Sequence, residues 1–341
     1  GQDQELRRDI HGKDGIGEYA MKTYLGVDVG SVTTKLALIN ENYDLVASIY
    51  SRTQGNPVDM IKKGLQEIRN QMSQEAQIAG VATTGSGRQL AGVILGADLV
   101  KNEITAHAVA AMHYVPDVQT IFEIGGQDSK IIIVRDGIVV DFGMNSVCAA
   151  GTGSFLDHQA ERLNIRIEDF GSHAMRSQNP ARIAGRCTVF AESDMIHKQQ
   201  MGYPTDDIVY GLSQSLVRNY LNNVALGKAV LPKMVFQGGV AFNQGIIKAF
   251  NETFHTEVFV PPHNELMGAI GAAMLVHEEM RDDHRKSSFA GFGISNTEYK
   301  ISSFICKACP NLCEISQIAM DGKVLARWGA RCDMWDRIDK K

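Results

Sequence analysis

Three glycine-rich turns, each following a short apolar run, carry the residues best suited to binding a nucleotide. Asp28 precedes the first turn, which then contains Gly30, Ser31, Thr33, Thr34 and Lys35. Glycine lets a backbone approach a phosphate closely, and successive amides and hydroxyls donate hydrogen bonds to phosphate oxygens. A carboxylate such as Asp28 can hold Mg²⁺, usually through water. An ordinary β-hairpin turn with a polar rim would have the same composition.

The second and third turns would complete a site for ATP or ADP. The second follows Glu123 and contains Gly125, Gly126, Gln127 and Asp128. Its carboxamide or carboxylate can position the attacking water or bind the metal. The third contains Gly238, Gly239 and Asn243, where a double glycine lets adenosine lie against the backbone and a helix N-terminus favours the phosphates. The three turns together predict a Mg²⁺–ATP site with Asp28, Gln127 and Asp128 as catalytic candidates.

Two cysteines, Cys148 and Cys187, each stand just before a helix-like segment. A helix N-terminus offers partial positive charge and free amides to an anionic, thiolate-held cluster. Two cysteines cannot complete a 4Fe–4S cluster, which generally needs four ligands. Buried structural thiols are the alternative interpretation of this pair.

Four further cysteines lie close together near the end of the sequence: Cys306, Cys309, Cys313 and Cys332. Four thiolates can satisfy one metal without help from another chain. A second 4Fe–4S cluster is favoured, while structural zinc and free thiols remain open. The histidines at 107, 113, 158 and 197 lack a ligand spacing and are expected to be surface or satisfied core side chains.

The elements that position these residues follow from the pattern of apolar residues. Two strand–turn–strand units, one around Gly30 and one around Gly125, echo each other, which predicts a divergent internal duplication with a cleft between the two turns. A strand is expected at 257–262. Helices are expected at 57–72, 90–111 (with breaks), 154–163, 205–226, 244–254 and 265–280.

Length and composition limit the class of protein. The chain has 341 residues, which favours two lobes or more, and a net charge of −5, which argues against a nucleic-acid footprint. No apolar run reaches the length of a membrane span, and the polar start has no signal-peptide pattern, so a cytoplasmic protein is expected. The first residue is Gly1 rather than Met, which suits a processed chain or a piece of a longer protein.

The three turns resemble the phosphate-1, phosphate-2 and adenosine motifs of the acetate and sugar kinase/Hsp70/actin superfamily. Gly268 and Gly271 fit its second connecting helix. The stretches CAAGTGSFLD and GRCTVFAESDMIHKQQMG resemble the BadF/BadG/BcrA/BcrD ATPase family, which includes activators of 2-hydroxyacyl-CoA dehydratases and related benzoyl-CoA reductase components. The resemblance covers about Tyr24 to Met280. Glu123 departs from the aspartate usual in the family.

This resemblance implies an α/β, two-lobed, actin/Hsp70/sugar-kinase-like ATPase fold of the duplicated ribonuclease H type. The expected division is a linker or disordered start at 1–22, lobe I at 23–115 with the returning helix 264–280, lobe II at 116–263, a linker at 281–303 and a cysteine-rich tail at 304–341.

The resemblance also implies a homodimer in which Cys148 and Cys187 of both copies hold one 4Fe–4S cluster. The expected acceptor is an iron–sulfur dehydratase, reductase or double-cubane-type protein, and the expected donor is ferredoxin or flavodoxin. No nucleic acid or membrane partner is expected. Two other functions are compatible with the nucleotide motifs alone: a small-molecule kinase and an ATP-switched binding module.

Overall fold

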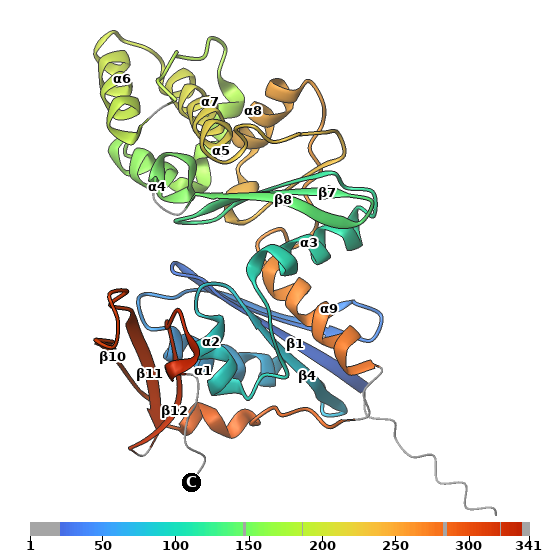
Figure 1. The fold of residues 1–341 in the computed structure, drawn as a ribbon. Helices are drawn as coiled ribbons and strands as arrows, with labels where there is room; N and C mark the ends of the chain where they lie inside the picture. Colours follow the sequence, from blue (N-terminus) through green and yellow to red (C-terminus); the bar gives the residue numbers. More distant parts are fainter. Residues whose placement is uncertain (1–20, 146–147, 186, 282–284, 321, 336–341) are drawn as a thin grey trace, which may run out of the picture.

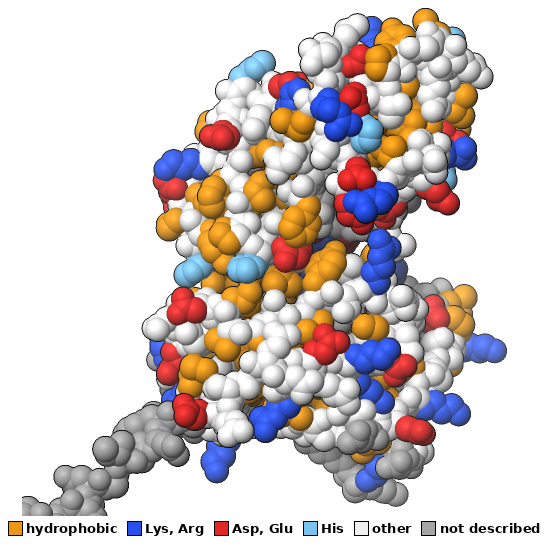
Figure 2. All heavy atoms as spheres, turned by 180° about the vertical axis from the view of Figure 1, so that it is seen from behind, with side chains coloured by type: hydrophobic (Ala, Val, Ile, Leu, Met, Phe, Trp, Pro, Cys, Tyr) orange, Lys and Arg blue, Asp and Glu red, His pale blue; other side chains and the backbone are white. Residues whose placement is uncertain are grey.

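The computed structural model describes residues 21–145, 148–185, 187–281, 285–320 and 322–335. Two lobes lie one above the other, with two helices between them (Figure 1). On the face seen in Figure 2, acidic and basic side chains are interspersed over both lobes. Across the described residues, no helix combines the length and apolar character needed to cross a bilayer.

Lobe I is built on a five-stranded sheet. Its strand order is β3 (Leu45–Arg52), β2 (Thr33–Asn40), β1 (Met21–Val29), β4 (Ala76–Thr84) and β5 (Leu99–Val100). β1 pairs antiparallel with β2 and parallel with β4. Helices α1 (Pro57–Gln71) and α2 (Arg88–Leu95) cover the sheet and bury apolar residues such as Ile61 and Ile94 against it.

Lobe II repeats the central part of this arrangement. Its sheet runs β8 (Ile138–Asn145), β7 (Ser129–Arg135), β6 (Thr120–Ile124) and β9 (Met234–Gln237). β6 pairs antiparallel with β7 and parallel with β9, as β1 does with β2 and β4. The predicted internal duplication is therefore confirmed.

Helices and short 3₁₀ turns cover the lobe II sheet. They are η1 (Ala149–Gly151), α4 (Gly153–Arg162), α5 (Ile167–Arg176), α6 (Thr188–Gln200), α7 (Thr205–Val224), η2 (Gly239–Phe242) and α8 (Gln244–Phe254). The core beneath them is aromatic: Phe122 stacks on Phe250 with ring centroids 4.8 Å apart. Tyr220 of α7 packs edge-on against Phe122 and is fully buried.

Two helices, α3 (Glu103–Tyr114) and α9 (Met267–Arg281), cross between the lobes (Figure 1). Their backbones approach so closely that a Cβ atom on Gly271 would lie 1.8 Å from the Ala106 carbonyl oxygen. α9 also packs on β1 and β4. The small residues of α9 thus allow this helix to contact both lobe I and α3.

Some elements differ from those expected. The helical pattern at 90–111 is divided into α2, β5 and α3, and the helix α5 was not predicted. The helix-like segment expected after Cys187 is α6. The strand expected at 257–262 is wrong, because only Phe259 forms a bridge, to Val235. Pro261 and Pro262 follow it, and proline has no N–H to continue a sheet ladder. The helices expected at 57–72, 154–163, 205–226, 244–254 and 265–280 are confirmed to within two residues at each end.

After α9, the chain runs back along lobe I and forms a small sheet (Figure 1). A short turn, η3 (Phe292–Asn296), lies against α1. The sheet is β10 (Lys300–Ile305), β11 (Glu314–Met320) and β12 (Lys323–Trp328), followed by η4 (Asp333–Trp335). Ile294 and Ile318 are buried in the same apolar cluster as α1 and α2, so this sheet extends the lobe I core.

Candidate functional site

A cavity of about 500 Å³ lies between the two lobes. Its volume falls within the range of small-molecule sites. Lobe I contributes Val32, Thr33, Tyr50 and Arg52. Lobe II contributes the second and third glycine turns together with residues of α4 and α5, among them Gly125, Gly126, Leu156, Asp157, Ile167, Ser172, Gly239 and Asn243. The cavity is therefore formed where the predicted nucleotide turns face one another.

The first turn is held by hydrogen bonds within lobe I. The Gly30 N–H donates to the Thr33 carbonyl oxygen at 2.9 Å, and the Thr53 hydroxyl donates to the Gly30 carbonyl oxygen at 3.1 Å. Thr34 is fully buried, with its hydroxyl 3.0 Å from that of Thr53. Thr34 thus supports the turn from behind, whereas Thr33 lines the cavity and Ser31 is exposed at the tip.

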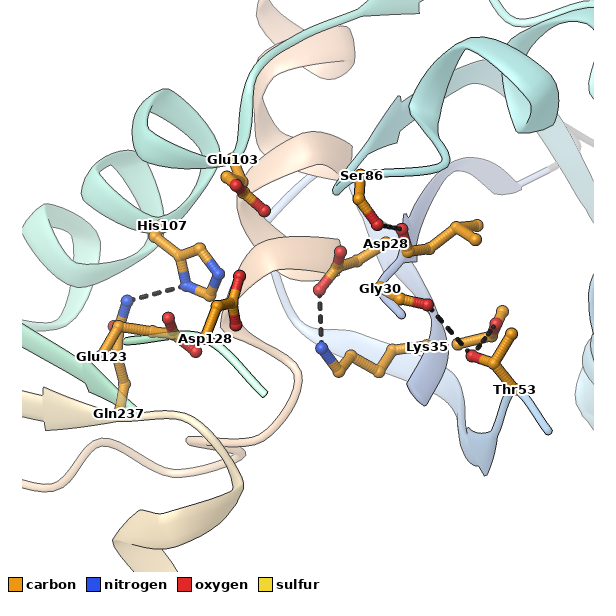
Figure 3. A network of polar contacts seen from close by, with 12 residues as sticks. Asp28, Gly30, Lys35, Thr53, Ser86, Glu103, His107, Glu123, Asp128 and Gln237 are labelled. Carbon is orange, nitrogen blue, oxygen red and sulfur yellow. Dashed lines mark hydrogen bonds and ion pairs between the residues drawn. The ribbon is translucent and has the colours of Figure 1, made fainter. Parts of the chain in front are cut away.

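Asp28 is the last residue but one of strand β1, beside this turn. It lies opposite Lys35 on β2, and the Lys35 Nζ is 2.8 Å from the Asp28 Oδ2. Asp28 is only 4% exposed. Burial opposes its ionisation, but the adjacent Lys35 ammonium outweighs burial and lowers the pKa of Asp28. The carboxylate is therefore charged and points toward the space between the lobes (Figure 3).

The second turn repeats this acid–lysine pair. Glu123 on β6 lies opposite Lys130 on β7, and their charged atoms are 3.0 Å apart. The Lys130 Nζ is also 2.8 Å from Asp128 and 3.8 Å from Glu103 of α3. Three carboxylates thus surround one lysine that is 2% exposed. Burial raises the pKa of Glu123 and of Glu103, against the lowering effect of Lys130.

Helix α3 brings two polar side chains between the two turns. Glu103 and His107 lie between Asp28 on one side and Glu123 with Asp128 on the other (Figure 3). The Nδ1 of His107 is 2.8 Å from the Nε2 of Gln237. Burial and then Lys130 lower the pKa of His107 to about 4, so its neutral Nδ1 accepts this hydrogen bond. The Oε1 of Gln237 is buried and has no hydrogen-bond partner among the residues that the structure describes.

The third turn requires glycine for two reasons. Gly238 has a φ of +93°, and a Cβ atom there would lie 2.4 Å from the Ile124 carbonyl oxygen. Asn264 holds the turn by accepting from the Gly238 N–H at 2.8 Å and donating to its carbonyl oxygen at 2.9 Å. Asn243 caps helix α8 by accepting from the amides of Gly245 and Ile246. Gly239 and Asn243 line the cavity.

The predicted nucleotide residues therefore differ in where they lie relative to the cavity. Those that line the cavity are Thr33, Gly125, Gly126, Gly239 and Asn243. Asp28, Lys35 and Asp128 form the polar network beside it, and Gln127 is exposed. Residues missed from the sequence are Tyr50, Arg52, Glu103, Lys130, Gln237 and Asn264. One signal was available: an acid and a lysine seven residues apart recur in both hairpins.

The donor set and the glycine surfaces fit a magnesium nucleotide. The cavity presents glycine backbone on the lobe II side, where a phosphate or a flat base can approach closely. Charged oxygens of Asp28 and Asp128 lie beside it, and hard oxygen ligands are those that Mg²⁺ prefers.

Cys148 is connected to the second turn through the start of α4. It caps η1, and the chain then enters α4, where the Gly153 N–H donates to the Gly125 carbonyl oxygen at 2.9 Å. The Ser154 N–H donates to the Gly126 carbonyl oxygen at 2.8 Å. Cys148 itself is half-buried, and its N–H donates to the Asn145 side chain at 3.0 Å. Movement of the turn would therefore move the start of α4 and the loop that carries Cys148.

Cys187 caps α6 and is also half-buried. The Asn219 side chain of α7 connects its segment with that of Cys148. The Asn219 Nδ2 donates to the Gly185 carbonyl oxygen at 3.2 Å, and a Cβ atom on Gly151 would lie 3.1 Å from the Asn219 Oδ1. Both cysteine segments therefore lie against the same part of α7.

The helices that follow the two cysteines are joined by polar contacts, among them one ion pair with an arginine. Glu192 of α6 lies 2.8 Å from Arg162 and 3.6 Å from His158, both on α4. Next to Cys187, the side chains of Val189 and Phe190 are 67% and 63% exposed. An apolar surface of this kind beside a half-buried thiol is suited to contact with another protein surface.

Both groups of cysteines bear on metal binding. Within the described ranges, no three His, Cys, Asp or Glu side chains are grouped closely enough to hold a metal ion alone. Cys148 and Cys187 offer two thiols per chain, a donor set that fits half of a four-thiolate cluster. Cys306, Cys309, Cys313 and Cys332 lie outside the nucleotide site, at the small sheet after α9.

The duplicated sheets, the α3–α9 crossing and the cleft between matched hairpins define an actin/Hsp70/sugar-kinase-like fold. Residues 25–276 match the model of the BadF/BadG/BcrA/BcrD ATPase family, and the chain belongs to this family.

Curated relatives carry dehydratase activator names. The chain is 33% identical over 264 residues to the 2-hydroxyisocaproyl-CoA dehydratase activator of Clostridioides difficile, covering 77% of this chain and 97% of the relative. It is 34% identical over 260 residues to the (R)-2-hydroxyglutaryl-CoA dehydratase activating ATPase of Acidaminococcus fermentans, covering 75% and 97%. It is 33% identical over 258 residues to the activator of lactoyl-CoA dehydratase of Anaerotignum propionicum, covering 74% and 97%.

Solved structures of two activators are similar. The activator of the 2-hydroxyisocaproyl-CoA dehydratase from Clostridium difficile with bound ADPNP has a TM-score of 0.68 at 33% identity, covering 76% of this chain and 96% of that chain. The Acidaminococcus fermentans (R)-2-hydroxyglutaryl-CoA dehydratase component A has a TM-score of 0.69 at 32% identity, covering 76% and 99%.

Proposed function

We propose that this chain is an ATP-dependent electron-transfer activator. Two copies would share one 4Fe–4S cluster, and ATP hydrolysis would drive a low-potential electron to a partner iron–sulfur enzyme. The partner would be a 2-hydroxyacyl-CoA dehydratase or a double-cubane-cluster protein, and ferredoxin or flavodoxin would be the donor. The contact between the second nucleotide turn and the start of α4 carries the proposal. The activator names of the relatives support the same role.

The nucleotide half of the function rests on the cleft. Gly125, Gly126 and Gly239 present backbone that a nucleotide can approach. Asp28 and Asp128 would hold Mg²⁺, directly or through water, and Gln127 would orient the attacking water. The two lysines that now pair with these carboxylates, Lys35 and Lys130, would turn toward phosphate oxygens as the metal takes their place.

The two thiolates of each chain would be completed by the same two from a second copy. A two-fold axis presents identical surface patches to each other, and this arrangement supplies the four ligands that a 4Fe–4S cluster needs. When bound there, the cluster supplies one-electron chemistry at low potential. The exposed Val189 and Phe190 would be covered in this contact.

Coupling between the two halves would follow the hydrogen bonds and ion pairs described above. Gly126 lies against Val32 of lobe I, because a Cβ atom on it would be 3.0 Å from the Val32 side chain. Lobe movement would therefore be transmitted through Gly125 and Gly126 to the start of α4. Glu192 would then carry the shift from α4 to α6 and so to Cys187. Hinge closure of this kind is a known class of transition.

The test is a serine substitution of each thiol in protein purified without oxygen. Cys148→Ser and Cys187→Ser are each expected to lose the iron and the visible absorption of the shared cluster and to bind ATP as the wild type does. Ser193→Ala is the matched control, because Ser193 lies on α6 and its hydroxyl donates to the Val189 carbonyl oxygen within the same helix. Unchanged iron content in either cysteine variant would refute the ligand assignment.

A further inference from the structure

The four cysteines after α9 lie in segments at one end of the small sheet. Ile305, the last residue of β10, pairs with Glu314, the first residue of β11. Cys306 and Cys313 follow and precede these residues directly, and the Cys306 N–H donates to the Cys313 carbonyl oxygen at 2.8 Å. Cys309 lies in the turn between them, where its carbonyl oxygen accepts from the Leu312 N–H at 3.3 Å. Three thiols thus belong to a single tight turn.

Cys332 reaches the same end of the sheet from β12. The last residue of that strand, Trp328, pairs with Ser316 of β11. The next residue, Gly329, passes so close to β11 that a Cβ atom on it would lie 2.4 Å from the Glu314 carbonyl oxygen. After Cys332, the Trp335 ring packs edge-on against Phe304 of β10 at 4.9 Å. Cys332 is therefore bounded on both sides by contacts with β10 and β11, the strands next to Cys306 and Cys313.

The surroundings of Cys306 suit a thiolate. Cys306 is 8% exposed, and the Ala308 amide and the Trp335 indole lie next to its sulfur. The indole Nε1 of Trp335 is buried, and within the described residues no acceptor lies in full hydrogen-bond geometry with it, although the Cys306 sulfur is its neighbour. A buried N–H without an acceptor is costly, and a thiolate sulfur is an acceptor for such donors. Hydrogen bonds to sulfur are a common second layer around thiolate-held metals.

We propose that Cys306, Cys309, Cys313 and Cys332 form one tetrathiolate site for a thiophilic metal centre, separate from Cys148 and Cys187. Either Zn²⁺ or an iron–sulfur cluster satisfies this ligand set, because both accept four cysteine thiolates. The four side chains are not already grouped as ligands within the described residues, so the exposed Cys309 and Cys332 turn inward on binding. Metal sites in proteins commonly reach their final ligand geometry only when the metal binds.

A metal at this site would hold the strands of the small sheet together and so stabilise the sheet where it packs on lobe I. A sheet of three short strands has little core of its own, and a structural metal is a common solution at that size. Here the metal would tie the ends of all three strands. Ile318 and Leu325 of the same sheet already pack in the apolar core of lobe I.

The test uses the full chain with both Cys148→Ser and Cys187→Ser, so that no metal is bound by Cys148 and Cys187. After anaerobic purification and incubation with Zn²⁺, or with iron and sulfide, this variant is expected to retain one metal centre per chain by elemental analysis. A colourless protein with one zinc identifies the zinc form, and a brown protein with iron and sulfide identifies the cluster form. Absence of both metals after both incubations would overturn the proposal.

A second comparison locates the metal. Adding Cys309→Ser or Cys332→Ser is expected to abolish binding of that centre, whereas Lys307→Ser, an exposed change in the same turn, leaves it in place. The only tryptophans of the chain are Trp328 and Trp335, so tryptophan fluorescence reports on this sheet alone. Metal removal by a chelator is expected to shift the emission to longer wavelength in the Lys307 variant and not in the cysteine variants. Metal retained in both cysteine variants would overturn the assignment.

Discussion

Replacing Gly271 by alanine tests the close crossing of α3 and α9 that joins the two lobes. The new Cβ atom would lie 1.8 Å from the Ala106 carbonyl oxygen, whereas real Cβ contacts essentially never fall under 3.0 Å. The two helices must therefore separate by about 1.2 Å at this point, the difference between those two distances. The obstacle is backbone, which cannot rotate away as a side chain can.

The expected loss of unfolding free energy follows from two opposing effects. Overpacking a core typically costs about 1–3 kcal/mol, and exchanging glycine for alanine within a helix stabilises by up to about 1 kcal/mol. Because the clash is with a carbonyl oxygen, we expect a net loss of about 2 kcal/mol. ATP affinity should also fall, because the cleft residues of lobe II move relative to Val32 and Thr33.

The assay is equilibrium urea unfolding followed by circular dichroism, since tryptophan fluorescence reports only on the small sheet. Gly64→Ala is the matched control. Gly64 is also within a helix, but a Cβ atom there would meet the flexible end of the Leu36 side chain, at 2.7 Å. This variant is expected to stay within about 1 kcal/mol of the wild type. Equal stability of the two variants would refute the close crossing.

Three further predictions concern the polar network. Lys130→Met leaves Glu123 and Asp128 without their shared partner and should reduce the unfolding free energy by about 3–5 kcal/mol, measured by urea unfolding against the exposed Lys63→Met. His107 has a pKa of about 4 in the folded chain and an ordinary value near 6.5, so the unfolded chain binds more protons between these values. The unfolding free energy should therefore fall by about 3 kcal/mol as the pH drops through this window. His107→Gln should reduce this dependence of stability on pH. The same dependence in the variant and the wild type would contradict the assignment to His107. Asp28→Ala should abolish ATP hydrolysis in a phosphate-release assay and leave the visible absorption intact, whereas retained turnover would exclude its metal-side role.

Much of the fold follows from local pattern. The repeated strand–turn–strand units can be recognised in the sequence because Asp28 and Glu123 each follow apolar residues, and Gly30 and Gly125 each come two residues later. Amphipathic spacing predicts α1, and small residues predict a closely packed α9. These features depend on neighbours in the sequence, which is why they can be read from one chain.

Other parts depend on contacts between distant residues. Glu103 and His107 belong to the network only because the α3–α9 crossing brings α3 between the two turns. α6 has weak amphipathic character and few buried residues, namely Ala191 and Met195, so its pattern indicated a helix-like segment after Cys187 but not where the helix ends. The convergence of Cys306 and Cys332 depends on the pairing of β11 with β12, which spacing alone does not specify.

Native mass spectrometry of anaerobically purified protein would test the central claim most directly. We predict that the wild-type protein forms a species of two chains that holds one shared 4Fe–4S cluster. Any other metal should be present equally in the wild type and in the Cys148→Ser variant. The Cys148→Ser variant should lack that cluster. A single chain holding the same cluster, or identical metal content in the two proteins, would contradict the account.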